Sequence, residues 1–195
     1  MHQTTAKKQT IYTKQGLWSL FLMCAFPLHL WALILAFRDV AWVTERTNAW
    51  DAVGVVAYAL LFALIETVLV FLAFVMLGFL VPRRWNPDKR TGFLILLALL
   101  LSVWGIISQL LFLWNIYLPA PAIQFLVRSG HPLRYLYAGA LAVVLPTVLL
   151  PIYLFLKSDG ILARIEDLAD RLSILVGLYL FLDAIGILIV IIRNL

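Results

Sequence analysis

Four polar side chains lie within long apolar stretches of this sequence, where polar residues are rare: His29, Glu66, Gln109 and Asp183. A carboxylate in the hydrocarbon core of a membrane is costly, so it normally faces the protein interior and either pairs or takes up a proton. A histidine beside two acids could hold a proton or a small cation, and an amide could complete the hydrogen bonds. We therefore treat these four residues as a candidate proton or cation site, with no catalytic residue, metal ligand or cofactor assigned.

Small residues flank these side chains at helical spacing, which is typical of surfaces where membrane helices pack closely. Ala63 precedes Glu66 by three residues, and Gly186 follows Asp183 by three. Tyr179, four residues before Asp183, offers that acid a hydroxyl neighbour. At about 1.5 Å per residue, the three ionisable side chains lie roughly 17 to 22 Å from the cytoplasmic end of their stretches, and the amide roughly 26 Å. The spacing predicts that the four side chains converge inside the protein.

The elements that must position these residues are five apolar stretches, each long enough to cross a bilayer. A hydrocarbon core of roughly 30 Å needs about 20 helical residues. The chain is 64% hydrophobic and 13% charged, with a mean hydropathy of +1.01. Because lipid offers no partners to backbone amides, helices are the expected spanning form. We predict an all-α, polytopic membrane bundle of five transmembrane helices, at about residues 17 to 37, 53 to 81, 92 to 118, 133 to 156 and 172 to 192.

Basic residues predict the orientation of the bundle. With the amino terminus in the cytoplasm, ten lysines and arginines lie on the inner side and five on the outer side. Four of the inner ones fall in the short segment RRWNPDKR, residues 83 to 90. We therefore expect a cytoplasmic amino terminus, an outer carboxyl terminus and a multi-pass location in the plasma (inner) membrane. The net charge of +5 is explained by attraction to anionic lipid headgroups, so no nucleic acid is expected as a partner.

The segments outside the spans complete the predicted organisation. Residues 1 to 15 are expected to be a disordered cytoplasmic tail, and residues 16 to 195 a single domain. Asp39 to Asp51 is more polar than its neighbours and is expected to be an outer loop. The run Ile123 to Val127 is too short to span, so it should rest at the interface or pack on the bundle. Residues 158 to 172, SDGILARIEDLADRL, predict a short amphipathic interfacial helix before the fifth span, with docking to a partner protein as the alternative.

Three classes of function are consistent with these features. The favoured one is a membrane-embedded accessory, anchor or assembly subunit without catalytic activity of its own, because common catalytic motifs are missing. The second is a small proton- or cation-coupled transporter or channel that uses Glu66, Asp183 and His29. The third is an integral membrane enzyme acting on lipid or isoprenoid substrates, with the same residues in a lateral pocket. The expected partners are the lipid bilayer and another membrane protein or a second copy of the chain.

Overall fold

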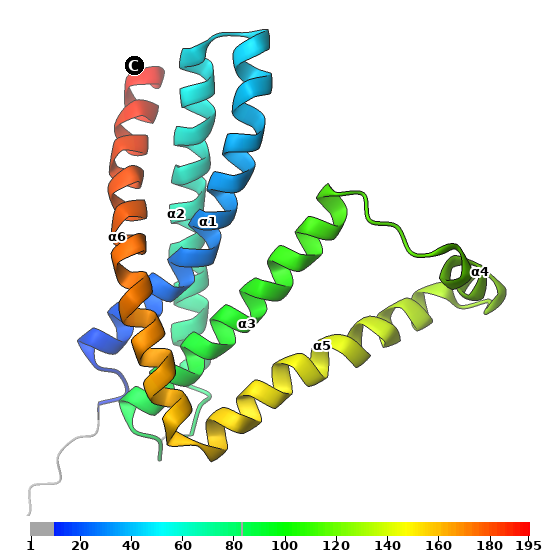
Figure 1. Cartoon of the computed structure of the whole chain (residues 1–195). Coiled ribbons are helices and arrows are strands. Elements are labelled where there is room, and N and C mark those ends of the chain that lie inside the picture. The colour runs from blue at the N-terminus through cyan, green and yellow to red at the C-terminus, as the bar shows by residue number, and fades with distance from the viewer. Residues whose placement is uncertain (1–9, 83) are drawn as a thin grey trace, which may run out of the picture.

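The computed structural model of the chain describes residues 10–82 and 84–195. Six helices run through these residues (Figure 1): α1 (Lys14–Arg46), α2 (Ala49–Gly78), α3 (Pro87–Leu113), α4 (Ala120–Arg128), α5 (Pro132–Lys157) and α6 (Asp159–Asn194). All except α4 are long and apolar enough to cross a membrane, and no strand occurs in this part of the chain. The prediction of an all-α protein with five spanning helices is therefore confirmed.

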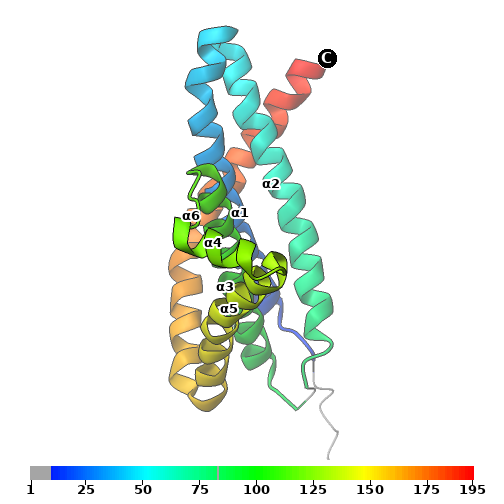
Figure 2. The ribbon, with the colours of Figure 1, turned by 90° about the vertical axis from the view of Figure 1, so that its right-hand side faces the viewer.

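Helices α1, α2 and α6 stand side by side as an elongated bundle (Figures 1 and 2). The antiparallel hairpin of α1 and α2 turns within two residues, and Asn48 caps α2 by accepting a hydrogen bond from the Asp51 amide at 2.9 Å. Helix α6 lies close to α2 at Gly186, where an added Cβ would lie 3.3 Å from the Ala57 carbonyl oxygen. The absence of a side chain at this glycine thus permits the close helix contact.

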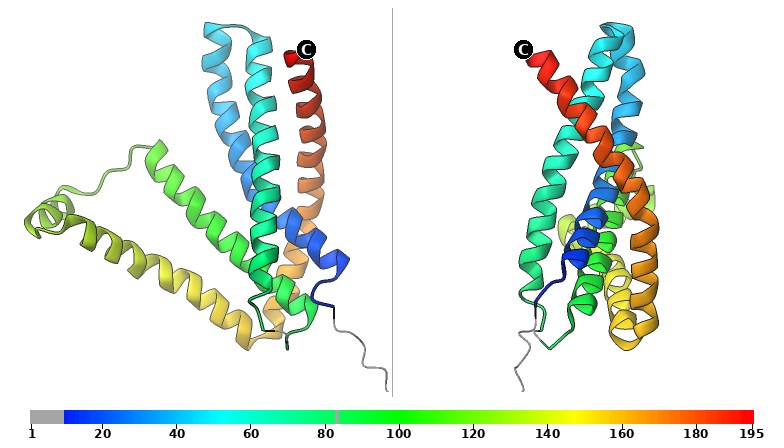
Figure 3. Two further views of the ribbon diagram at one scale, coloured as in Figure 1. Left: turned by 180° about the vertical axis from the view of Figure 1, so that it is seen from behind. Right: turned by 90° about the vertical axis from the view of Figure 1, so that its left-hand side faces the viewer.

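Helices α3, α4 and α5 form an arm that leaves the bundle at an angle (Figures 1 and 3). The first half of α3 is buried at Leu94 and Ala98, whereas its second half diverges from α1 and α2. Helix α5 lies along α3, and Trp104 Nε1 donates a hydrogen bond to Thr147 Oγ1 at 3.1 Å between them. Phe155, near the end of α5, is the one buried residue described for that helix. The arm therefore packs on the bundle at one end only.

The structure overturns one predicted loop and excludes one of the two alternatives given for a second segment. The expected outer loop from Asp39 to Asp51 is almost wholly helical, because α1 continues to Arg46 and α2 begins at Ala49. Polar residues can extend a helix beyond the hydrocarbon, where they meet water and headgroups. The run Ile123 to Val127 lies in α4, and none of the described side chains of that helix is buried. It therefore does not pack on the bundle.

The predicted interfacial helix is not a separate element. Residues 159 to 172 form the beginning of α6, which continues without interruption through the fifth span. Its apolar positions Ile165 and Ala169 join Val176 in a core with the first halves of α1 and α3. Part of the apolar stripe that indicated an amphipathic surface helix is therefore buried against other helices, while Leu168 remains exposed. Helix α1 begins at Lys14, and the first nine residues of the expected tail lie outside the described residues.

An arginine ties the start of the chain to the connection between α2 and α3. Arg90 is 2% exposed, and its guanidinium donates to the carbonyl oxygens of Ile11 at 2.7 Å and Pro82 at 3.1 Å. The Tyr12 hydroxyl donates to the Val75 carbonyl at 2.8 Å. Hydrogen bonds from a charged donor to backbone carbonyls stabilise this end of the fold more than neutral ones would. The segment before α1 is therefore fixed across the ends of α2 and α3.

Candidate functional site

A buried hydrogen bond joins α1 to α6 inside the bundle. His29 Nε2 lies 2.9 Å from Asp183 Oδ2, and the two side chains are 0% and 2% exposed. The other ring nitrogen, Nδ1, lies 2.9 Å from the carbonyl oxygen of Ala25, one turn earlier on α1. Tyr179, one turn before Asp183, stacks its ring on the imidazole with 5.8 Å between centroids and 8° between planes. Three contacts therefore hold the imidazole in one orientation.

These contacts determine how many protons the pair carries. A carbonyl oxygen has no proton to donate, so His29 Nδ1 must carry a hydrogen and donate it to Ala25. The contact of Nε2 with the carboxylate joins two atoms that both accept when deprotonated, so it requires one further proton. That proton resides on His29, as an ion pair, or on Asp183, as a neutral pair, and the net charge is zero in both forms. The pair therefore holds one shared proton away from water.

The bundle interior also contains polar atoms with unused hydrogen-bonding capacity. Asp183 Oδ1 is buried and has no partner in the described part of the chain, and the same holds for Thr67 Oγ1 on α2. Buried polar atoms normally find a partner, which is often an ordered water. Asp183 Oδ1 is therefore free to accept a hydrogen bond from a water or an added proton.

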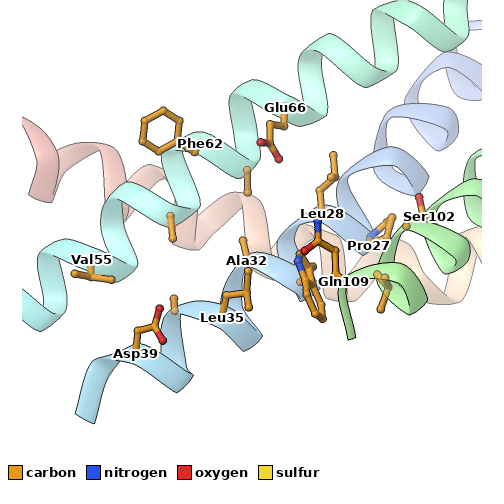
Figure 4. Close-up of a pocket in the computed structure, with 16 residues that line it drawn as sticks. Pro27, Leu28, Ala32, Leu35, Asp39, Val55, Phe62, Glu66, Ser102 and Gln109 are labelled. Atoms are coloured by element: carbon orange, nitrogen blue, oxygen red, sulfur yellow. The ribbon is translucent and has the colours of Figure 1, made fainter. Parts of the chain in front are cut away.

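A second polar region is a pocket of about 560 Å³ between α1, α2 and α3 (Figure 4). Most of its lining is apolar, including Leu28 and Trp31 of α1 and Phe62 of α2. Figure 4 shows the Glu66 carboxylate of α2 and the Gln109 amide of α3 in the space between the three helices. The second half of α3, which diverges from the bundle, forms one wall of the pocket. Its shape combines an apolar wall with a few polar groups, as ligand sites commonly do.

The two carboxylates of this pocket differ in their partners. Asp39, toward the end of α1, accepts a hydrogen bond from the neighbouring Arg38 Nε at 2.8 Å. Glu66 is exposed to the pocket and has no hydrogen bond or ion pair with any residue that the structure describes. An unpaired carboxylate in a membrane-spanning helix requires a proton, a cation or a hydrogen-bond donor from outside the chain. Glu66 is therefore the group in the pocket that most requires a ligand.

The structure divides the four predicted site residues into two pairs. His29 and Asp183 are in direct contact, whereas Glu66 and Gln109 line the lateral pocket and neither His29 nor Asp183 does. Helix α1 separates the pairs, because His29 faces α6 while Leu28, beside it in the chain, faces the pocket. The four side chains therefore do not share one cavity.

Sequence reasoning missed part of both sites. Tyr179 was expected to offer its hydroxyl to Asp183, but its ring stacks on His29 instead. Trp31 and Asp39 line the pocket and were not predicted as site residues. The available signal was the spacing of Leu28, Trp31, Leu35 and Asp39, which places them on one face of a helix. This spacing did not indicate a site, because Asp39 was expected to begin an outer loop and not to belong to the helix.

Comparisons with protein-family models, curated proteins and solved structures gave no significant match. The described residues contain no group of three or more histidine, cysteine or acidic side chains that could hold a metal ion. Five helices are long and apolar enough to cross a membrane, which defines the class: this is a helical, multi-pass membrane protein. Its function is therefore argued from the pair and the pocket.

Proposed function

We propose that the protein is a small membrane carrier that binds a proton or a cation inside the bilayer. The observation that carries this proposal is the unpaired Glu66 carboxylate in a pocket between three apolar helices. A passive anchor gains nothing from an unpaired carboxylate among spanning helices, whereas a carrier needs such a group to compensate the charge of its ligand. Gln109, on the opposite wall, supplies both a hydrogen-bond donor and an acceptor.

In this proposal the His29–Asp183 pair is a proton site that lies behind the pocket wall. If the pair loses its shared proton or takes up a second one, the charge of the bundle interior changes by one unit. Helix α1 carries His29 on one face and lines the pocket with Pro27, Leu28 and Trp31 on another. A shift of α1 that follows a change in protonation would therefore alter the pocket. Two sites that bias one movable element are the physical requirement for coupling.

The test is proton flux into proteoliposomes that contain a trapped pH-sensitive dye and a potassium diffusion potential. The parent protein should acidify the lumen, and Glu66→Gln and Asp183→Asn should each remove most of that flux. Glu45→Gln is the matched control, because Glu45 is an exposed acid of α1 outside the pocket. Flux no faster than in protein-free liposomes, or unchanged in both variants, would contradict the proposal.

We propose the orientation predicted from the basic residues, in the plasma (inner) membrane. Figure 1 supports it, because the start of α1, the α2–α3 connection and the α5–α6 turn lie at one end of the molecule. Arg84, Lys89 and Lys157 belong to that end. A cytoplasmic position of this basic end follows the usual charge distribution of membrane proteins.

An accessory or assembly subunit is the second candidate, and the arm favours it. Helix α5 has one buried residue among those described, so most of its surface is available to another helix. The partner would be another membrane protein or a second copy of the chain. If this candidate is right, the protein should purify with a partner at fixed stoichiometry, and Ala142→Trp, on the exposed surface of α5, should abolish that association. Ala184→Trp, at an exposed position of α6, should leave it intact. A monomer in both cases would contradict this candidate.

A lipid-modifying enzyme is less well supported by the geometry. The sequence-based hypothesis required His29, Glu66 and Asp183 to meet in a lateral pocket, where a histidine and two acids could exchange protons with a substrate. The pocket instead contains two carboxylates, Asp39 and Glu66, and no histidine among its described lining residues. The acid and base groups are therefore not gathered at one reacting centre.

A further inference from the structure

We infer that the lateral pocket binds a lipophilic organic cation, an ammonium or phosphonium ion with an apolar body, which enters from the bilayer. This inference rests on the proposed carrier function and specifies the class of its ligand. The pocket volume of about 560 Å³ falls within the range typical of sites for drug-sized molecules. It is too large for a proton alone, so its size points to a ligand with a body of its own.

The charge of the pocket selects a cation. Glu66 and Asp39 are the acidic residues of its described lining, and no lysine, arginine or histidine lines it. Arg38 already compensates Asp39 through two hydrogen bonds, at 2.8 and 3.4 Å. Glu66 remains uncompensated by any residue that the structure describes. In its carboxylate form Glu66 would pair with one positive charge, and no basic side chain of the described lining would attract an anion.

The remaining lining favours an organic ion over a metal or another inorganic ion. The lining offers few side-chain oxygens for the six to eight ligands of a Ca²⁺ site: Glu66, Gln109 and Ser102, besides Asp39, which already accepts hydrogen bonds from Arg38. Trp31 and Phe62 supply aromatic surface instead. An indole face attracts ammonium and similar cations, and this attraction grows when water is excluded. Apolar walls with one carboxylate match an ion whose charge is surrounded by hydrocarbon.

The route into the pocket also selects an apolar ligand. The second half of α3, which forms one wall of the pocket, diverges from the bundle (Figure 1), so we infer that the ligand enters beside this helix, from the bilayer. At Gly105 of α3, an added Cβ would have no atom within 4 Å, so space remains at this wall. A ligand that arrives through hydrocarbon must tolerate that medium, and delocalised or alkyl-covered cations do so better than strongly hydrated ones. Entry and binding therefore favour the same chemical class.

Tetraphenylphosphonium and tetraphenylborate provide the sharpest test, because they share size and shape and carry opposite charge. The full chain in lipid nanodiscs would be dialysed against each ion, with empty nanodiscs as the blank. We expect saturable binding of the cation and none of the anion. Glu66→Gln should weaken cation binding about tenfold or more, which corresponds to the loss of one ion pair in a partly dry site. Trp31→Leu should weaken it several-fold, and Glu45→Gln should leave it unchanged.

Equal binding of the two ions, or cation binding that Glu66→Gln leaves unchanged, would overturn the inference. A failure of the proposed ligand class can be distinguished from a failure of the proposed carrier function. Cation binding that depends on Glu66, together with no proton flux in proteoliposomes whether or not tetraphenylphosphonium is present, would support the ligand class and refute the carrier function. Proton flux that depends on Glu66, together with no binding of tetraphenylphosphonium, would support the carrier function and refute the ligand class.

Discussion

Replacing Asp183 by leucine and by asparagine separates the structural role of the buried pair from its proton. Asp183→Leu removes the partner of His29 Nε2 and leaves that nitrogen unpaired at a position that is 0% exposed. An unpaired buried polar group costs about 1–3 kcal/mol in soluble proteins, and polar contacts between membrane helices average about 0.6 kcal/mol. Because the pair is completely buried, we expect its contribution to exceed this average for contacts between membrane helices. We therefore expect a loss of about 1–2 kcal/mol.

Asp183→Asn should behave differently, because its amide can donate a hydrogen bond to Nε2 of the neutral imidazole. His29 then keeps its hydrogen on Nδ1 and its contact with the Ala25 carbonyl. The hydrogen bond between α1 and α6 survives, but the shared proton is gone. We expect stability within about 0.5 kcal/mol of the parent, the usual range for substitutions that preserve contacts. The same variant should lack the proton-dependent flux.

The assay is unfolding in mixed micelles of dodecylmaltoside and dodecyl sulfate, followed by circular dichroism. A double-mutant cycle with His29→Leu isolates the pairwise contribution, which should be about 1 kcal/mol or more, since the two residues are in contact. Unchanged stability in Asp183→Leu would refute the claim that the pair holds α1 to α6. A loss in Asp183→Asn as large as that in Asp183→Leu would refute the claim that the hydrogen bond can be maintained without the shared proton.

Two further predictions concern the packing of the bundle. Gly186→Leu should lower the free energy of unfolding by about 1–3 kcal/mol, because the new side chain would meet the backbone of Ala57. Gly177→Leu should leave it unchanged, because an added Cβ there meets nothing within 4 Å. Equal effects of the two substitutions in the same unfolding assay would contradict the close contact. Arg90→Met should lower the free energy of unfolding by about 1–2 kcal/mol, because two hydrogen bonds are lost, and it should expose the start of α1 to trypsin. Arg164→Met, at an exposed position of α6, should have neither effect. Equal digestion of both variants would contradict the anchoring role.

Much of the fold was predictable, because the length and composition of each stretch leave a helix as the one form that satisfies its backbone in lipid. The ends of the helices were not predictable from the sequence. The polar segment around Thr47 and Asn48 indicated a long loop, yet a two-residue turn suffices because a capping side chain satisfies the first amides of α2. The start of α6 has the pattern of a surface helix, but its apolar face meets a core whose presence only the tertiary fold reveals.

The candidate site was predictable residue by residue and not as an arrangement. Rarity within apolar stretches singled out His29, Glu66, Gln109 and Asp183, and the small residue at 186 marked a true close approach. Spacing along one helix gives a face and a depth, but it does not say which neighbour occupies that face. Whether the acids meet depends on which faces of α2 and α6 turn toward each other, and in the fold Asp183 faces α1 while Glu66 faces the pocket. The separation into a closed pair and an open pocket therefore required the structure.

The most direct test of this account is a crystal structure of the full chain grown from a lipid phase. We predict that His29 Nε2 lies within hydrogen-bond distance of Asp183, sealed from solvent, while Glu66 faces a pocket between α1, α2 and α3 that contains lipid, detergent or another ligand. A structure in which α3 closes against α2 along its whole length, or in which Glu66 and Asp183 share one cavity, would contradict it.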